Sequence, residues 1–181
     1  MFEEFTQLSF WVHSAAGKMH FFGAITALIL GPLVLIKRKG GFFHRAVGGT
    51  YVLVMLALNF SALTIFGMGR FNLFHLFALI SLATLIPGMV AISQAVRTRN
   101  RAWFQTHAHL MVWSYYGLVM AGAAQLFYRT IPRITGTFET VDNFWMYVMP
   151  ISTLLTVFLT NRYIPRSVER MFGPEPVKQP G

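Results

Sequence analysis

The chain is patterned as long apolar runs separated by short polar and basic segments. Five runs without Asp, Glu, Lys or Arg lie at about residues 19–36, 46–69, 71–96, 108–128 and 143–161. Each approaches or exceeds the length of about 20 residues that a helix needs to cross the hydrocarbon core of a bilayer. The pattern therefore predicts five transmembrane helices and an all-α integral membrane protein.

The segments between the runs predict how these helices are connected. "KRKGG" and "FGMGRFN" are typical of tight turns, "AVRTRNRAWFQT" of a basic loop, and "RTIPRITGTFETVDN" of a longer loop in which Pro and Gly end a helix. Short loops make sequential helices run antiparallel. We therefore expect an up-down four-helix bundle with the fifth transmembrane helix packed beside it.

The two ends of the chain differ from the apolar runs. Residues 1–17 begin acidic and lack a basic n-region, so we expect an interfacial segment that ends at Gly17 and no removable signal peptide. Residues 18–165 make up the transmembrane domain. Residues 166–181 are polar and rich in Pro and Gly, which predicts a largely disordered tail.

Charge is scarce but strongly one-sided. Only 12% of residues are charged, 55% are apolar, mean hydropathy is +0.53, and the net charge is +9. Because cytoplasmic loops are enriched in Lys and Arg, this distribution predicts an outside N-terminus and a cytoplasmic C-terminus, and it explains the basic excess without nucleic acid. Eleven of the fifteen basic residues flank the runs on one side: Lys37, Arg38, Lys39, Arg45, Arg97, Arg99, Arg101, Arg162, Arg166, Arg170 and Lys178.

Several kinds of chemistry are excluded by residue types. The chain has no cysteine, which removes disulfides, thiolate metal sites and cysteine nucleophiles. No Asp or Glu falls within a run, which argues against a carboxylate proton relay and an intramembrane zinc hydrolase. The sequence also contains no HExxH or GxSxG motif.

Five of the six histidines lie near the ends of predicted helices, and four of them form two sets by depth, with His109 beside His107. His20 and His75 are near the outer ends of the first and third helices, whereas His44 and His107 are near the inner ends of the second and fourth. These helices are diagonal partners in an up-down bundle, so each pair can direct its imidazoles at the bundle axis. Two axial imidazoles are a known ligand set for haem iron.

The layout therefore predicts two haem b groups, an outer one held by His20 and His75 and an inner one held by His44 and His107. Lys18 and Arg45 lie beside a site histidine at each face, where a haem propionate would accept a charged hydrogen bond. These two side chains can equally reach lipid phosphates. Each histidine can also be an ordinary hydrogen-bonded core residue.

Small and polar residues share helical faces with these histidines. At about 100° per residue, His107 shares its face with polar residues that would be buried in the interior of a bundle, so we expect His107 to face the bundle axis. His109 points the other way, and we expect it to meet a headgroup, a loop or a haem propionate. His13 is more typical of an interfacial residue. The small residues either admit a porphyrin or allow close helix packing. The faces comprise Ala24, Ala27 and Gly31 with His20; Gly48, Tyr51, Met55 and Ala62 with His44; and Met111, Ser114, Leu118, Ala121 and Gln125 with His107.

Three histidine motifs resemble those of a family of bacterial membrane proteins known only as a domain of unknown function. They are H-x-x-G-x-x-x-A-L-x-L-G-P-L from His20, H-R-x-x-G-x-x-Y-V from His44 and H-x-x-x-M-x-x-S-Y from His107. In the family the third motif resembles H-x-x-W-M-x-R-S-Y, and here Leu110 and Trp113 replace its Trp and Arg. The resemblance implies a location in the bacterial inner membrane, and it implies no established reaction.

Two classes of function follow from the sequence. The first is a membrane electron carrier, similar in its histidine layout to di-haem transmembrane b-type cytochromes, with a quinone as a candidate partner near Asn59, Ser61 and Thr64. These three polar residues can equally hydrogen-bond neighbouring helices. The second is a non-redox multi-pass protein of assembly, binding or transport, whose histidines are structural or bind a metal transiently. Membrane lipid is a partner in both, and a partner membrane subunit or a homo-oligomer is open in both.

Overall fold

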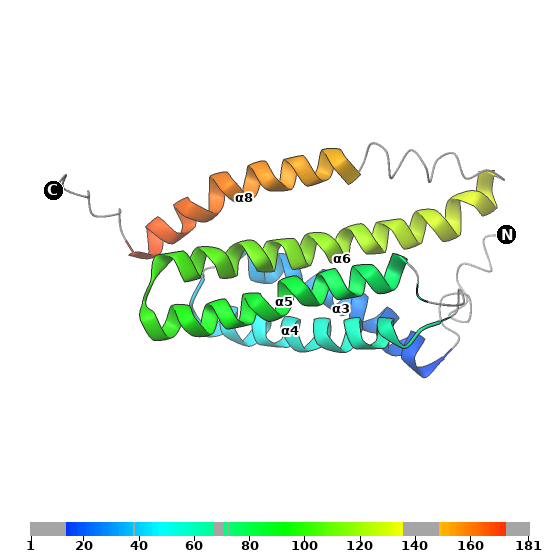
Figure 1. Cartoon of the computed structure of the whole chain (residues 1–181), viewed down its shortest axis with the longest axis horizontal. Helices are drawn as coiled ribbons and strands as arrows, with labels where there is room; N and C mark the ends of the chain where they lie inside the picture. Colours follow the sequence, from blue (N-terminus) through cyan, green and yellow to red (C-terminus); the bar gives the residue numbers. More distant parts are fainter. Residues whose placement is uncertain (1–13, 38, 67–70, 72, 136–148, 173–181) are drawn as a thin grey trace. The chain divides into compact units, whose positions relative to one another are not determined.

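The described part of the chain is helical throughout its regular structure. The computed structural model describes residues 14–37, 39–66, 71, 73–135 and 149–172, and these contain no β-strand. The helices in Figure 1 are α3 (Ala15–Ile36), α4 (Phe42–Leu63), α5 (Leu73–Thr98), α6 (Arg101–Thr135) and α8 (Met149–Phe172). The predicted all-α class is confirmed.

Three of these helices are long and apolar enough to cross a membrane. They are α3, α4 and α5 from Phe74 onward. Many of their large apolar side chains, Ile29 and Leu53 among them, are exposed. Apolar surface of this extent is unfavourable in water, whereas lipid solvates it. These three helices thus have the composition and exposure of membrane helices.

Helix α3 begins earlier than the sequence predicts. The Ser14 hydroxyl accepts a 3.0 Å hydrogen bond from the Gly17 backbone N–H and caps the first turn. Serine is a favoured N-cap because it satisfies one of the first amide groups of a helix. Gly17 therefore lies inside α3, and the expected break at this glycine is wrong. The interfacial segment predicted before it lies mostly outside the described residues.

A lysine closes the other end of α3. Lys39 Nζ donates to the Val34 carbonyl at 2.9 Å and to the Leu35 carbonyl, two of the last acceptors of the helix. Partial burial lowers the pKa of Lys39 below the usual lysine range, because desolvation disfavours the ammonium form. Gly40 follows with φ +78°, a conformation that glycine adopts without strain. The predicted tight connection at residues 37–41 is confirmed.

Helices α5 and α6 are joined by two residues, which corrects the expected basic loop. Arg99 adopts φ +55°, and Asn100 Oδ1 accepts a 2.9 Å hydrogen bond from the Ala102 N–H. Asparagine caps a helix by this contact. The basic residues on either side are therefore helical, and His107 lies in the second turn of α6.

Prolines end fewer helices than the sequence suggests. Pro32, Pro87 and Pro165 lie inside α3, α5 and α8, and α6 continues through position 132 to Thr135. Membrane helices tolerate proline because neighbouring groups satisfy the carbonyl that it frees. Helix α8 likewise continues to Phe172, so the expected tail boundary at residue 166 falls within a helix.

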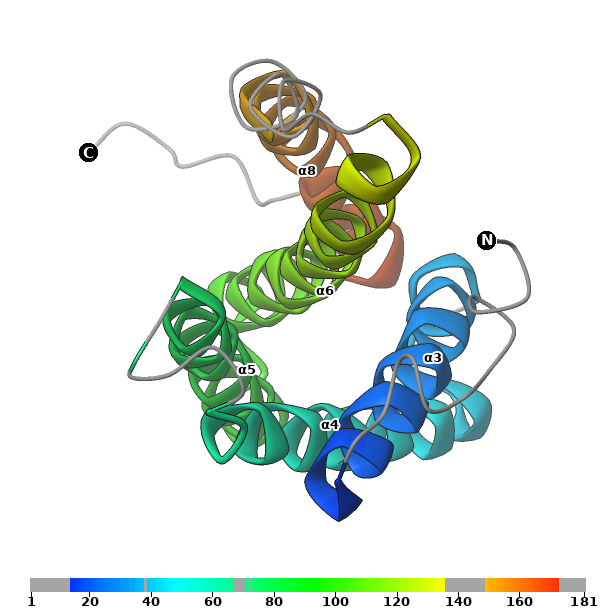
Figure 2. The same cartoon turned by 90° about the vertical axis from the view of Figure 1, so that its right-hand side faces the viewer.

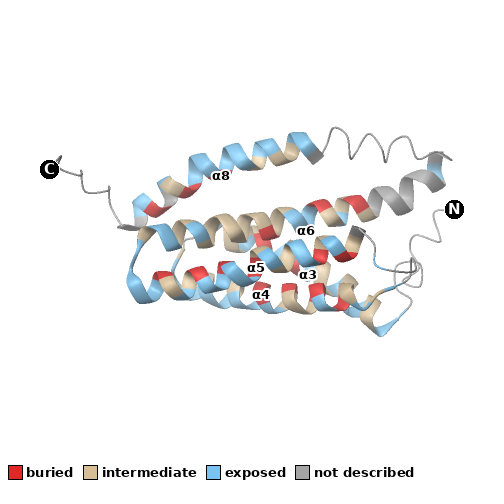
Figure 3. Ribbon diagram, viewed as in Figure 1, coloured by how far each residue is buried: buried red, intermediate tan, exposed pale blue. Residues whose placement is uncertain are grey.

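The chain divides into two compact units, each described by itself. Unit 1 contains α3, α4, the first half of α5 to Ala83, and Gly117–Ala123 of α6. In it α4 lies against both α3 and the first half of α5 (Figure 2). Unit 2 contains the second half of α5, the remainder of α6, and α8. Buried residues of α8 lie toward its C-terminal end (Figure 3).

Candidate functional site

His20 contacts the helix next to its own. Its Nδ1 lies 3.2 Å from the Leu58 carbonyl oxygen, which links α3 to α4. A carbonyl only accepts hydrogen bonds, so Nδ1 carries the proton, and in the neutral ring Nε2 holds the lone pair. This is the tautomer that a histidine uses when it ligates a metal through Nε2. Gly23, one turn along α3, lies against the same leucine.

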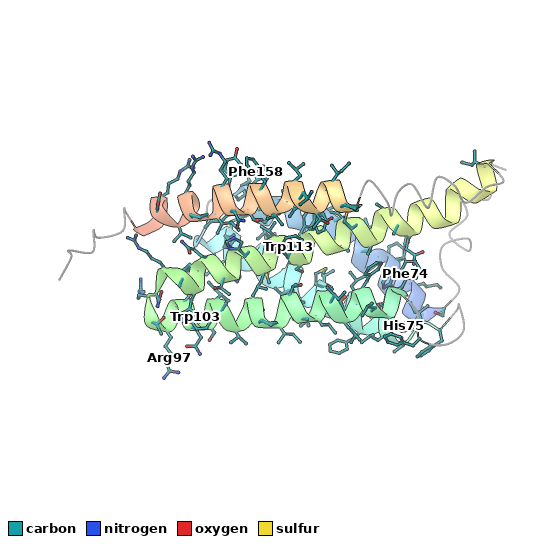
Figure 4. All side chains as sticks on the ribbon, turned by 45° about the horizontal axis from the view of Figure 1, so that its top comes forward. Phe74, His75, Arg97, Trp103, Trp113 and Phe158 are labelled. Atoms are coloured by element: carbon teal, nitrogen blue, oxygen red, sulfur yellow. The ribbon has the colours of Figure 1, made fainter. Side chains whose placement is uncertain are left out.

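His75 is the most buried of the described histidines. It is 2% exposed at the start of α5 and lies in tilted contact with the rings of Phe66 and Phe71, with centroids 5.0 and 5.2 Å away and interplanar angles of 31° and 33°. Figure 4 labels it near the N-terminal end of α5. The two phenyl rings therefore restrict the orientation of the buried imidazole.

Hydrogen bonds fix how these two histidines lie along α4. Asn59 Nδ2 donates to Ser81 Oγ at 3.0 Å, which sets the register between α4 and α5. On α5, His75 lies six residues before Ser81, which is about 9 Å along the helix. On α3, His20 lies three residues before Gly23, which contacts Leu58 of α4, and this is about 4.5 Å along the helix. From these two contacts with α4, both histidines are displaced toward the C-terminal end of α4. The two histidines therefore occupy the same end of unit 1, offset by about one helical turn.

His107 docks α6 onto α5 within unit 2. Its Nδ1 lies 2.9 Å from the Gly88 carbonyl oxygen, so this ring also carries its proton on Nδ1. Gly88 is buried where the helices approach closely: a Cβ there would lie 2.4 Å from Met111 Cε and 3.3 Å from Leu110 Cβ. His107 thus contacts the neighbouring helix α5 through a backbone carbonyl, and its expected orientation toward a bundle axis stays a prediction.

The other sequence-derived site residues are less constrained. His44 is half-buried in the first turn of α4, Arg45 beside it is exposed, and Lys18 is exposed in the first turn of α3. His109 Nδ1 lies 2.9 Å from the Gln105 carbonyl of its own helix. His13 lies outside the described residues. His44 belongs to unit 1 and His107 to unit 2, so their pairing stays a prediction from the sequence.

The small residues near His20 and His44 serve helix packing. Ala27 and Gly31 are the buried residues of α3, and a Cβ at Gly48 would lie 3.8 Å from Val34 Cγ1 across the α3–α4 contact. Tyr51 and Met55 are buried on α4. These contacts correspond to the close-packing interpretation of the two faces, since small residues let membrane helices approach each other.

The polar residues in the C-terminal half of α4 form hydrogen bonds within the protein. Besides Ser81, Asn59 Nδ2 donates to the Met55 carbonyl at 2.7 Å. Ser61 Oγ donates to the Leu58 carbonyl at 2.8 Å, and Thr64 Oγ1 to the Ser61 carbonyl at 2.8 Å. Hydrogen bonds between and within helices therefore account for these groups, and the quinone-site interpretation gains no support from them.

A hydroxyl cluster between α6 and α8 was missed at the sequence level. Tyr116 Oη lies 3.0 Å from Ser152 Oγ and 2.6 Å from Thr153 Oγ1. Further along α8, the hydroxyls of Thr156 and Thr160 donate to backbone carbonyls one turn earlier. The spacing of these hydroxyls at every third or fourth position was the available signal, because it places them on one face of α8.

Metal-binding capacity is limited by the ligand types at hand. Among residues 14–37, 39–66, 71, 73–135 and 149–172, no three His, Asp or Glu side chains are grouped to hold a metal ion. Bis-imidazole haem requires only two protein ligands, both histidine. A site built from two histidines, as in the haem hypothesis, stays a prediction from the sequence.

The described helices, with their exposed apolar surfaces and interhelical polar contacts, define an α-helical membrane protein. Residues 17–163 match the family described as "Predicted membrane protein (DUF2306)", and the chain belongs to this family. The family relationship inferred from the three histidine motifs is thus confirmed. The chain matches no curated protein and no solved structure. The similarity to di-haem cytochromes has no support from these comparisons.

Proposed function

We propose that the protein is a multi-pass protein of the bacterial inner membrane that carries electrons through haem b. In this proposal α3, α4, α5, α6 and α8 are its five transmembrane helices, the N-terminus is outside and the C-terminus is cytoplasmic. The one-sided distribution of Lys and Arg supports the orientation.

The exposure pattern of α8 supports its place as the fifth transmembrane helix. Its hydroxyl residues include Thr160, which is buried, whereas Ile151, Leu154 and Phe158 are exposed at 61–69%. A helix in water would turn its apolar face inward. The inverted arrangement suits lipid, because the apolar side chains meet acyl chains and the hydroxyls find hydrogen-bond partners in the protein.

The tautomer of His20 carries the haem proposal. Its Nδ1–H donates to the Leu58 carbonyl, so Nε2 is the nitrogen that holds the lone pair for iron. His75 lies toward the same end of unit 1 and is oriented by Phe66 and Phe71. These two histidines are the proposed ligands of one haem. His107 shares the His20 tautomer, which supports it as a ligand of a second haem.

The proposed activity is electron transfer from a membrane reductant to an acceptor on the other side of the membrane, and haem held by these histidines would supply the one-electron chemistry. Burial of His75 would limit the access of water to the iron, and its contacts with Phe66 and Phe71 would hold its ring. Lys18 is positioned near His20 in the sequence and is the proposed cationic partner of a propionate, and Arg45 has the corresponding role beside His44. A quinol or another membrane reductant is the proposed electron donor.

Haem content and ligand variants test this function. The full-length chain, produced with ample haem and purified in mild detergent, should show a Soret band and a sharp α-band on reduction. His75→Ala should remove about one haem per chain, because one axial ligand is lost. His75→Met should retain haem with a raised reduction potential, since a thioether also ligates iron. That rescue separates ligation from a general folding defect.

His109→Ala provides the matched control. His109 is half-buried and bonds only within its own helix in the contacts described above, so its loss should leave haem content unchanged. Colourless wild-type protein would contradict the proposal. So would full haem content in both His20→Ala and His75→Ala.

A structural role for the histidines is the second candidate. It is favoured by the carbonyl contacts of His20 and His107, each of which links two helices. Beside His107 the helices also pack closely at Gly88. In that case the protein would be a non-redox membrane protein, colourless at any haem supply. His107→Ala would then lower stability by about 0.6–2 kcal/mol, the range for hydrogen bonds between membrane helices.

A further inference from the structure

We propose that the outer face of α8 binds an anionic phospholipid, with the headgroup phosphate on Arg162 and Arg166 and the acyl chains along the apolar residues that precede them. This inference rests on the proposed membrane crossing of α8, and it is independent of haem. It assigns a ligand to a surface that electron transfer does not use.

One face of α8 changes from apolar to cationic along its length. At about 100° per residue, five exposed side chains fall within a sector of about 80°. They are Ile151, Leu155, Phe158, Arg162 and Arg166. Nitrogen-tipped side chains project from the C-terminal end of this helix (Figure 4). The order matches one leaflet of a bilayer, in which acyl chains give way to phosphates.

The opposite face of the same segment packs into the protein. Thr160, Ile164 and Val168 are each buried, and they alternate with the exposed arginines. The segment is therefore fixed by its inner face while the guanidinium groups stay outside. Arg170, one turn beyond Arg166, extends the cationic stripe along the helix.

Phosphate is the group that this arrangement suits. A guanidinium offers parallel N–H donors that match two phosphate oxygens, and arginines one turn apart can bind one headgroup together. Glu169 is the only acidic residue in α8 and lies beyond the first two arginines. A diacyl lipid adds what a soluble phosphate lacks, namely chains that cover the exposed Phe158 and Leu155.

Lipid titration of the full-length chain tests the site. Native mass spectrometry in detergent would measure the binding of phosphatidylglycerol and, separately, of phosphatidylcholine. Each basic residue near an anionic surface contributes about fivefold in affinity. The double variant Arg162→Gln/Arg166→Gln should therefore bind phosphatidylglycerol on the order of twentyfold more weakly, with phosphatidylcholine binding unchanged.

Matched controls separate this site from general charge and from free phosphate. Arg97→Gln/Arg99→Gln removes the same charge from exposed positions at the end of α5 and should have little effect. Equal losses in both double variants would overturn the proposal, as would unchanged binding in the α8 variant. Competition by glycerol phosphate as effective as that by the diacyl lipid would assign the site to a soluble phosphate instead and overturn it.

A separate measurement tests the membrane crossing on which the site depends. The chain contains no cysteine, so Leu155→Cys introduces a single thiol. In native membranes this thiol should resist a membrane-impermeant maleimide and react after solubilisation and unfolding. Ready labelling in membranes would overturn the crossing and the lipid site together, whatever the haem content.

Discussion

Gly88→Ala tests whether α5 and α6 approach as closely as their packing around His107 requires. The added Cβ would lie 2.4 Å from Met111 Cε and 3.3 Å from Leu110 Cβ. The methionine tip can move, but the leucine Cβ is fixed to its backbone. Overpacking of this kind costs about 1–3 kcal/mol, against a gain of about 1 kcal/mol from replacing glycine in a helix. We expect a net destabilisation of roughly 0–2 kcal/mol.

Gly49→Ala is the matched control for this variant. Gly49 is an exposed helical glycine, and its Cβ would meet no described atom within 4 Å. It should gain helix propensity without a steric cost. Chemical unfolding in mixed micelles, followed by far-UV circular dichroism, should therefore separate the two variants by about 1–3 kcal/mol.

A double-mutant cycle identifies the contact responsible. In a Met111→Ala background the closest atom is absent, so the cost of Gly88→Ala should fall by about 0.5 kcal/mol or more. Equal stability of the Gly88→Ala and Gly49→Ala variants, with no coupling to Met111, would refute the close approach of α5 and α6 at this glycine.

Three further outcomes follow from single contacts. Tyr116→Phe removes the hydroxyl that hydrogen-bonds to α8 and should lower the free energy of unfolding by about 0.6–2 kcal/mol. Amide hydrogen exchange should become faster in α8 alone. A change of exchange rates spread evenly over the helices would argue against this contact. Asn59→Leu should lower the free energy of unfolding by about 1–3 kcal/mol, because its polar partners are left unsatisfied. This loss should be smaller in a Ser81→Ala background, and thermal unfolding of the wild type, the two single variants and the double variant measures it. After reductive methylation with ¹³C-formaldehyde, the Lys39 resonance should titrate below the usual lysine range because burial lowers its pKa. The Lys39→Arg variant assigns this resonance. A titration midpoint in the usual lysine range would contradict the partly buried position of Lys39 at the end of α3.

Hydrophobic patterning predicted the helices well and their ends less well. Long apolar runs located the helices because crossing a bilayer requires length and apolarity together. The residues at which helices begin depended on single capping side chains, namely Ser14 before α3 and Asn100 before α6. These caps allow helix to form in segments whose composition is typical of loops. Pro132 was expected to end α6, yet the helix passes this position. Proline is a weaker stop inside a membrane protein than in water.

The candidate site was predicted in its residues and only partly in their contacts. Helical phase separates the directions of His107 and His109, because the angle between side chains follows from sequence separation, and His107 is the one of the two whose Nδ1 contact reaches another helix. Phase alone does not distinguish a cofactor from a carbonyl oxygen as the partner of an imidazole. The contact between Tyr116 and α8 joins residues 36 positions or more apart, so the spacing of the α8 hydroxyls indicates their shared face but does not identify Tyr116 as their partner.

Electron paramagnetic resonance of the oxidised protein tests the central claim most directly. If His20 and His75 ligate one iron, the wild-type chain should show a low-spin ferric signal typical of two axial imidazoles. His20→Ala and His75→Ala should each abolish that component or convert it to a high-spin signal, while His109→Ala preserves it. The absence of any ferric haem signal, or a low-spin signal untouched by both ligand variants, would contradict the proposed haem site.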